Sequence, residues 1–186
     1  IFVLYNRVFY KNIQYLKKNV SNVKNVIIKF TDKDKKNILK NSIHIISVMN
    51  FLFGDVKIKY SKKELDTVNM VVINKIGIPI FLIYNNNFPE TYSIDIRTKN
   101  IRYLLKPLEK LQIIKKINFK YKNNNKKMLI PSETIDKTID LYKSNTFKPG
   151  FFEQMIDIKN RINNQKKFGN FAIAIQAMKF AKKFIN

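Results

Sequence analysis

The chain has 186 residues, with 36 Lys and Arg against 13 Asp and Glu, so its formal net charge is +23. Because it is 45% hydrophobic and 13% aromatic, it can build a core and is not a disordered basic tail. It has no Cys, which excludes disulfides, thiolate zinc sites and cysteine nucleophiles, and no apolar run approaches the roughly 18–20 residues of a membrane span.

In the first half of the chain, hydrophobic spacing predicts helices and strands. They are, in order, a helix over 5–16, a strand over 23–30, a helix over 35–53, and strands over 56–60, 68–73 and 78–84. Gly54 stands where a glycine would end the second helix. The segment Asn74–Gly77 separates the last two strands, and we interpret it as a hairpin tip.

In the second half of the chain, hydrophobic spacing predicts further helices and strands. They are a helix over 101–111 that is kinked at Pro107, a strand over 113–121, a helix from Ser132 to 142, and a strand over 171–175 that runs into a helix over 177–184. Helices and strands mix without regular βαβ alternation, which favours an α+β fold. We therefore expect one domain, residues 1–186, with a curved antiparallel sheet packed on helices and basic terminal segments.

The residues give little support for catalysis. The only histidine, His44, lies in the predicted helix beside Ile43 and Ile45, a setting more typical of a packed side chain than of a base or ligand. The acidic pairs, such as Asp136 with Asp140, are surrounded by lysines and fit a solvated face. No G-x-G-x-x-G, Walker A or G-x-S-x-G pattern is present. We therefore expect no enzyme activity, catalytic residue, metal or cofactor.

The basic residues are spread along the whole chain, and Lys greatly outnumbers Arg. This distribution suits diffuse phosphate contacts on several faces better than bidentate reading of bases. A polyanionic partner would relieve the self-repulsion of so much charge, and folded RNA is the commonest partner of that kind.

An ordered series of short motifs resembles the large-subunit ribosomal protein five family. The matching segments are residues 22–30, Lys35 to Leu39, Phe53-Gly54-Asp55, Tyr60-Ser61-Lys62-Lys63, Val72 to Phe81, and Phe168 to Phe184. The resemblance covers the first half and both ends of the chain, and it is patchy from 92 to 162. Lys75, Asp55 and Phe81 depart from the residues that the family carries at those places.

The resemblance implies a structural constituent of the large ribosomal subunit that binds rRNA, including 5S rRNA, at the central protuberance. It also implies a hairpin loop directed toward the P-site tRNA, and contacts with neighbouring ribosomal proteins, among them a small-subunit head protein. The A/T-rich codon bias of the composition favours a mitochondrial ribosome. The predicted RNA-binding residues are Lys35, Lys36, Lys57, Lys59, Lys62, Lys63, Lys75, Gly77 and Pro79.

Three alternatives stay open at this point. The first is another organellar ribosomal protein, for which charge and composition would look the same. The second is a basic structural subunit of an organellar membrane complex, held at anionic lipid by the Phe-, Ala- and Lys-rich carboxyl-terminal helix. The third is a nuclease or maturase, although no paired acidic motif supports it.

Overall fold

An eight-stranded sheet runs through the computed structural model of the chain, which describes residues 5–87, 89–121, 129–142, 148–164 and 170–185. The strands are β1 (Val23–Asp32), β2 (Val56–Lys63), β3 (Thr67–Asn74), β4 (Pro79–Asn86), β5 (Ser93–Thr98), β6 (Arg102–Leu105), β7 (Lys110–Tyr121) and β8 (Leu129–Asp140). Their order is β2-β3-β4-β1-β5-β6-β7-β8. Among these described strands, β1 and β4 form the single parallel pair.

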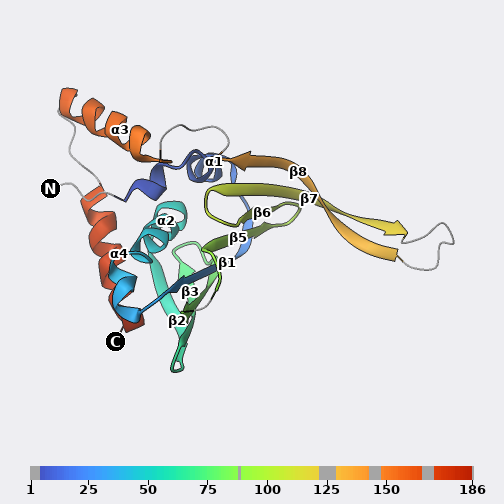
Figure 1. Ribbon diagram of the computed structural model, residues 1–186, viewed down its shortest axis with the longest axis horizontal. Coiled ribbons are helices and arrows are strands. Elements are labelled where there is room, and N and C mark those ends of the chain that lie inside the picture. Colours follow the sequence, from blue (N-terminus) through green and yellow to red (C-terminus); the bar gives the residue numbers. More distant parts are fainter. Residues whose placement is uncertain (1–4, 88, 122–128, 143–147, 165–169, 186) are drawn as a thin grey trace.

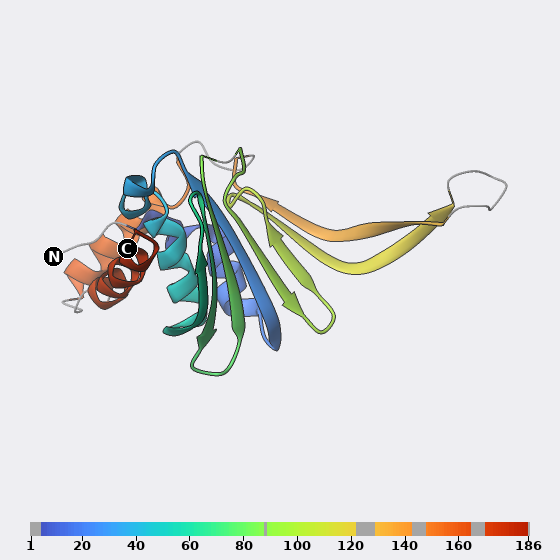
Figure 2. The same cartoon turned by 90° about the horizontal axis from the view of Figure 1, so that it is seen from below.

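The helices gather on one face of the sheet (Figures 1 and 2). They are the 3-10 helices η1 (Asn6–Phe9) and η2 (Lys35–Leu39), and the α-helices α1 (Lys11–Asn19), α2 (Ile43–Phe53), α3 (Phe151–Asn163) and α4 (Asn170–Ile185). On the far side of the sheet from these helices, the outer parts of β7 and β8 extend away from the body as a two-stranded arm (Figure 2).

The alternation predicted for the first strand sets the orientation of the whole sheet. Val26, Ile28 and Phe30 of β1 are buried in the core, whereas Ile27 and Lys29 between them are half-buried on the opposite face. This pattern is that of a strand with one face packed against helices. The α+β class and the mostly antiparallel sheet are therefore confirmed.

Helix α2 lies at the centre of the helical layer and ends as predicted. Gly54 has a φ of +75°, and its N–H donates to the carbonyl of Asn50 at 2.8 Å. The single helix predicted over 35–53 is wrong, because η2 and α2 are separate. Between them the Asn41 and Ser42 side chains donate to Asp32 at the end of β1, and this tie holds the chain where one helix ends and the next begins.

The hairpin tip between β3 and β4 is also confirmed. Gly77 has a φ of +86°, a conformation that other residues adopt at a cost. The Asn74 side-chain oxygen accepts from the N–H of Ile76 at 3.2 Å and from that of Ile78 at 2.8 Å. Pro79 begins β4 opposite Ile73.

Three predictions in the second half of the chain are wrong, and one helix there was not predicted. Residues 101–111 form β6, a turn and the start of β7, and Ser132–Asp140 belong to β8 instead of a helix. Residues 171–175 belong to helix α4 instead of a strand. No element was predicted where the structure has α3. The leucine spacing over 101–111 imitated a helix because the chain reverses at Pro107. Tyr103 and Leu105 before that turn, and Leu108 and Leu111 after it, all reach the same core.

No helix in the described ranges is long and apolar enough to cross a bilayer.

Candidate functional site at His44

Helix η1, the start of α2 and the end of β1 meet at one corner of the molecule, around the only histidine. Six residues define this corner, which we call the His44 junction: Tyr5, Arg7, Asp32, His44, Tyr92 and Lys148. Asp32 ends β1 and Asn86 ends its parallel neighbour β4, so the junction lies near the carboxyl ends of the parallel pair. In open sheets with parallel strands, ligands commonly bind beyond these ends.

His44 lies in the first turn of α2 and is partly buried. The pKa of its imidazole is lowered to about 4, mainly by burial and then by the nearby charges of Arg7 and Lys148. The Tyr5 ring stands edge-on to it, with the ring centroids 5.4 Å apart. The buried Nδ1 atom has no hydrogen-bond partner within the described part of the chain. His44 is therefore neutral at physiological pH and able to accept a proton or a hydrogen bond.

Arg7 reaches the junction from η1. Its guanidinium carbon lies 4.9 Å from the centroid of the Tyr92 ring, a cation–π arrangement. Its Nη1 atom is buried, and no residue that the structure describes accepts a hydrogen bond from it. Arg7 and Tyr92 line the wall between two cavities of about 540 and 250 Å³. A guanidinium held flat on an aromatic ring presents a fixed fork of donors.

Asp32 organises the polar side of the junction and is only 6% exposed. It accepts hydrogen bonds from the Ser42 hydroxyl, from Asn41 Nδ2 at 3.2 Å and from the Tyr92 hydroxyl at 3.4 Å. Burial is the main cause of the raised pKa of Tyr92. Because Ser42 directly precedes α2, this network fixes the start of the helix that carries His44.

The segment before α3 brings Lys148 to the same corner. Asn6 Nδ2 donates to the carbonyl of Pro149 at 3.3 Å. Gly150 has a φ of +79°, and a Cβ atom at this position would stand 2.4 Å from the carbonyl oxygen of Asn6 and 2.8 Å from the Tyr10 ring. Only glycine allows so close an approach, so Gly150 is what lets Lys148 lie next to η1.

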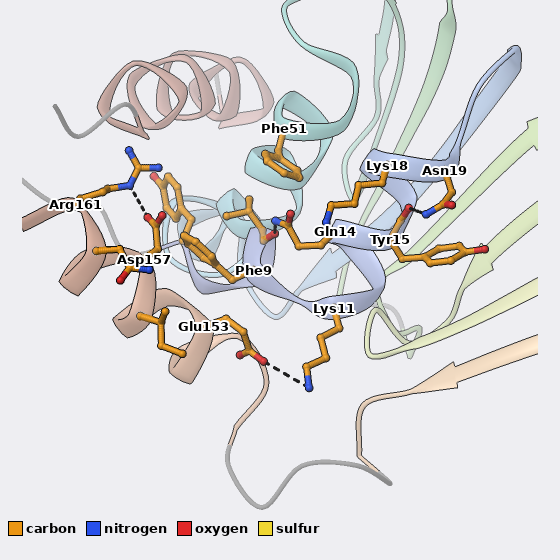
Figure 3. Close-up of a pocket in the computed structure, with 14 residues that line it drawn as sticks. Phe9, Lys11, Gln14, Tyr15, Lys18, Asn19, Phe51, Glu153, Asp157 and Arg161 are labelled. Atoms are coloured by element: carbon orange, nitrogen blue, oxygen red, sulfur yellow. Dashed lines mark hydrogen bonds and ion pairs between the residues drawn. The ribbon is translucent and has the colours of Figure 1, made fainter. Parts of the chain in front are cut away.

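A larger groove, of about 1160 Å³, shares Tyr5 with the junction and is drawn in Figure 3. Helices α1 and α3 form its walls, and Phe9 and Phe51 contribute apolar surface to it (Figure 3). Two ion pairs stand at its edges, Lys11 with Glu153 at 3.9 Å and Arg161 with Asp157 at 2.7 Å. Aromatic rings and these two ion pairs line the groove.

The residues predicted to bind RNA lie elsewhere. Five of them form a surface that we call the lysine edge, along strand β2 and the β3–β4 turn: Lys57, Lys59, Lys62, Lys63 and Lys75. All five are exposed. Lys62 pairs with Glu64 at 2.7 Å and Lys75 with Asp55 at 2.8 Å, and each partner raises the pKa of its lysine.

The other four residues predicted to bind RNA are not among the residues of the His44 junction either. Gly77 and Pro79 belong to the β3–β4 turn next to Lys75. Lys35 and Lys36 belong to η2, and their side chains lie outside the described part of the chain. RNA contact at these nine positions stays a prediction that no observation tests.

Sequence reasoning missed the His44 junction. One signal was available: Asn41 and Ser42 directly before an apolar run are typical of a helix start. They would have placed His44 in a first turn instead of mid-helix. Nothing in the sequence pattern indicates that Arg7, Tyr92 and Lys148 approach this histidine.

Comparison with known proteins gives a consistent fold. No protein-family model and no curated protein sequence matches the chain. Among solved structures, it is similar to a dehydrogenase (MviM) from Clostridium difficile, with a TM-score of 0.70 and 18% identity over 98% of this chain and 60% of that one. For a dehydrogenase from Chromobacterium violaceum the TM-score is 0.67 and the sequence identity 12%, over 97% of this chain and 59% of that one. For KijD10, a 3-ketoreductase from Actinomadura kijaniata, the TM-score is 0.63 and the sequence identity 7%, over 96% of this chain and 59% of that one.

These comparisons overturn the ribosomal assignment. The matched structures are dehydrogenases and reductases, so the resemblance to ribosomal protein five is wrong, and with it the predicted partners: large-subunit rRNA, 5S rRNA, P-site tRNA and a small-subunit head protein. The expectation that the chain is not an enzyme is overturned too. The short motifs had matched local strand and turn patterns, which different folds can share. A mitochondrial location stays a prediction.

At these identities the likeness establishes the fold, and the chain spans about 60% of the length of the dehydrogenase (MviM) that it matches. The described residues do not fit a nicotinamide dinucleotide. Gly54, Gly77 and Gly150 stand in three separate turns, with no glycine-rich phosphate loop between a strand and a helix. Within the described ranges, no group of three or more His, Cys, Asp or Glu is arranged to hold a metal ion.

Proposed function

We propose that this chain forms the substrate side of an NAD(P)-dependent oxidoreductase, with His44 as the residue that exchanges a proton with a substrate hydroxyl or carbonyl oxygen. Similar folds in a dehydrogenase and a 3-ketoreductase support this proposal. The observation that carries it is the state of His44: the only histidine is partly buried and uncharged, and its Nδ1 has no partner in the described structure.

The chain's own contribution is to bind the substrate and to handle its proton, because its described residues form no dinucleotide site. Interconversion of an alcohol and a carbonyl moves a proton at oxygen, and a positioned imidazole is the side chain most often used for such a transfer. The wall of Arg7 and Tyr92 beside two cavities offers donors that would orient a polar substrate. Asp32 holds the start of α2, and so holds His44 in place.

Turnover by the full-length protein tests this function. A panel of keto and hydroxy compounds is offered with each reduced and oxidised nicotinamide dinucleotide, and absorbance of the reduced form is followed. We expect at least one compound to react, and His44→Asn to lower kcat by about 10²-fold or more. The matched control Lys59→Gln, an exposed position on β2, should react at the wild-type rate.

Two results would refute the proposal. One is a folded full-length protein that turns over none of the panel with either dinucleotide. The other is a His44→Asn variant with undiminished kcat.

A further inference from the structure

We infer that the groove between α1 and α3 binds the aromatic ring of an uncharged ketone or alcohol. This inference rests on the proposed function, because it names the class of substrate that the chain would accept there.

The first argument is the size of the groove. Its volume is about 1160 Å³, against about 540 Å³ for the cavity that Arg7, Asp32 and Tyr92 line. Sites that enclose organic ligands have volumes of about 300–1,000 Å³. The groove therefore has room for a ring together with its substituents.

The second argument is the apolar surface that four helices contribute to the lining (Figure 3). Helix η1 contributes Phe9, α1 contributes Tyr15, α2 contributes Phe51, and α3 contributes Ile156, which is 42% exposed. Aromatic rings pack favourably against one another in edge-to-face and offset arrangements, beyond the gain from the area that they bury. The lining therefore favours an aromatic ligand over an aliphatic one of the same size.

The third argument is that the charges of the lining offset one another. Lys11 pairs with Glu153 at 3.9 Å, and Arg161 pairs with Asp157 at 2.7 Å. The remaining charged residue of the lining, Lys18, is exposed, so water and salt screen its ammonium group. A charged ligand would gain little from these groups.

Two amide side chains of the lining are already engaged as donors. Gln14 Nε2 donates to the carbonyl of Val8 at 2.6 Å, and Asn19 Nδ2 donates to the carbonyl of Tyr15 at 2.7 Å. These hydrogen bonds hold the polar groups in the wall of the groove, and they leave the rings as its main unfilled surface.

The fourth argument is that two of the rings are held in place by residues outside the lining. The Lys17 ammonium lies over the Phe51 ring, 5.5 Å from its centroid, and the Lys137 ammonium lies over the Tyr15 ring at 5.3 Å. Such cation–π contacts restrict the rings before any ligand arrives. A preorganised site loses little freedom when it binds a ligand.

Tyr5 connects the groove with the residue that we propose to transfer the proton. It belongs to the lining of the groove, and its ring stands edge-on to the His44 imidazole with the centroids 5.4 Å apart. One side chain therefore separates a ring bound in the groove from His44. A carbonyl or hydroxyl group on a short substituent of that ring is the part of the ligand that would be directed toward the imidazole.

Two ketones with the same carbon skeleton test the inference, acetophenone and cyclohexyl methyl ketone. Each is titrated into the ¹⁵N-labelled chain without any dinucleotide, and the amide signals of Val8, Gln14 and Asn160 are followed. We expect saturable shifts at these residues, with acetophenone bound about fivefold more tightly than the cyclohexyl compound. No saturable shift up to the solubility limit, or equal affinity for the two ketones, overturns the inference.

Variants decide whether the binding belongs to this groove. Asn160 is an exposed residue of the lining on α3, so Asn160→Trp should fill the groove and abolish the shifts at Val8 and Gln14. Asn163→Trp makes the same exchange on the same helix, at an exposed position outside the lining, and should leave the affinity unchanged. Equal affinity for acetophenone in the two folded variants would overturn the inference.

A second variant keeps the test decisive if amide dispersion shows that Asn160→Trp is unfolded. Phe9→Leu keeps apolar surface in the groove but removes one ring, so the preference for acetophenone over the cyclohexyl compound should fall. An unchanged preference would show that the ring does not contact the ligand, and would overturn the inference.

The two proposals fail separately. If neither ketone binds but His44→Asn still abolishes turnover of another compound, the aromatic site is wrong and the proton-transfer role stands. If acetophenone binds as expected but no compound is turned over in a manner that depends on His44, the groove is a binding site and the proposed function is wrong.

Discussion

The His44 junction and the lysine edge place positive charge in opposite settings. At the lysine edge the ammonium groups are exposed, and Lys62 and Lys75 each pair with one carboxylate, Glu64 and Asp55 respectively. At the junction there are few charges, but Arg7 Nη1 and His44 Nδ1 are buried without a described partner. Exposed charges are screened by water and salt, so they change stability little. Buried polar atoms without a hydrogen-bond partner destabilise the fold, and their presence calls for a functional explanation.

The comparison explains why the net charge of +23 is a poor guide to the site. The lysines that produce this charge are spread over the whole surface, so their number does not locate a site. The junction is set apart by burial and by which groups the fold brings together, so changes at the two regions should differ in both stability and pH dependence.

The largest stability difference should come from two glycines. A Cβ at Gly150 would meet the Asn6 backbone oxygen at 2.4 Å, whereas at Gly77 nothing lies within 4 Å. Both have positive φ, which costs an alanine about 1–2 kcal/mol. Gly150→Ala should also force η1 and Lys148 apart and cost about 3 kcal/mol or more in total, against about 1 kcal/mol for Gly77→Ala.

Urea unfolding followed by circular dichroism measures both glycine variants. Equal losses would show that the Lys148 segment does not pack on η1 as described.

Two aspartates give the next comparison. Asp32→Ala removes the carboxylate that accepts from the buried Ser42 hydroxyl and the half-buried Tyr92 hydroxyl, and should lower the free energy of unfolding by about 2 kcal/mol. Asp55→Ala removes one exposed partner of Lys75 and should leave the thermal midpoint unchanged within error. A thermal scan in which Asp32→Ala is as stable as Asp55→Ala would contradict the assigned network.

The pH dependence of stability follows from His44. Its pKa is about 4 in the folded chain against 6.5 for the ordinary group, so the unfolded state binds more protons between these values. Stability from the neutral imidazole is complete above the unfolded pKa and is lost as the pH falls toward 4. The loss between about pH 7 and pH 5 should be about 2 kcal/mol.

Urea unfolding at the two pH values, with His44→Asn as the comparison, isolates this contribution. The variant should lack that part of the pH dependence. A variant that loses as much stability as the wild type would assign the effect to other groups.

The smallest effects are expected at the lysine edge. Lys62→Gln and Lys75→Gln should not change the urea midpoint at moderate salt, because exposed ion pairs contribute little to stability. A clear loss at either position would mean that the edge is structurally more important than its exposure indicates.

Local sequence patterns were sufficient for much of the first half of the fold. The alternation in β1, β3 and β4, the end of α2 at Gly54 and the turn at Gly77 each depend on neighbours within a few residues. The strand order does not, and neither does the contact of Arg7 with Tyr92 or the approach of Lys148 to His44. Short motifs therefore matched a ribosomal family whose sheet this chain does not share, and the junction could not be assembled from sequence alone.

The proposed role of His44 requires that its imidazole be uncharged beside Arg7 and Lys148 in the folded chain. The Hε1 signal of this one histidine, followed with pH in chloride, reports its state without interference from any other imidazole. We predict a midpoint near 4. A midpoint near the ordinary value of 6.5 would show an exposed histidine free of its cationic neighbours, and would contradict the junction as described.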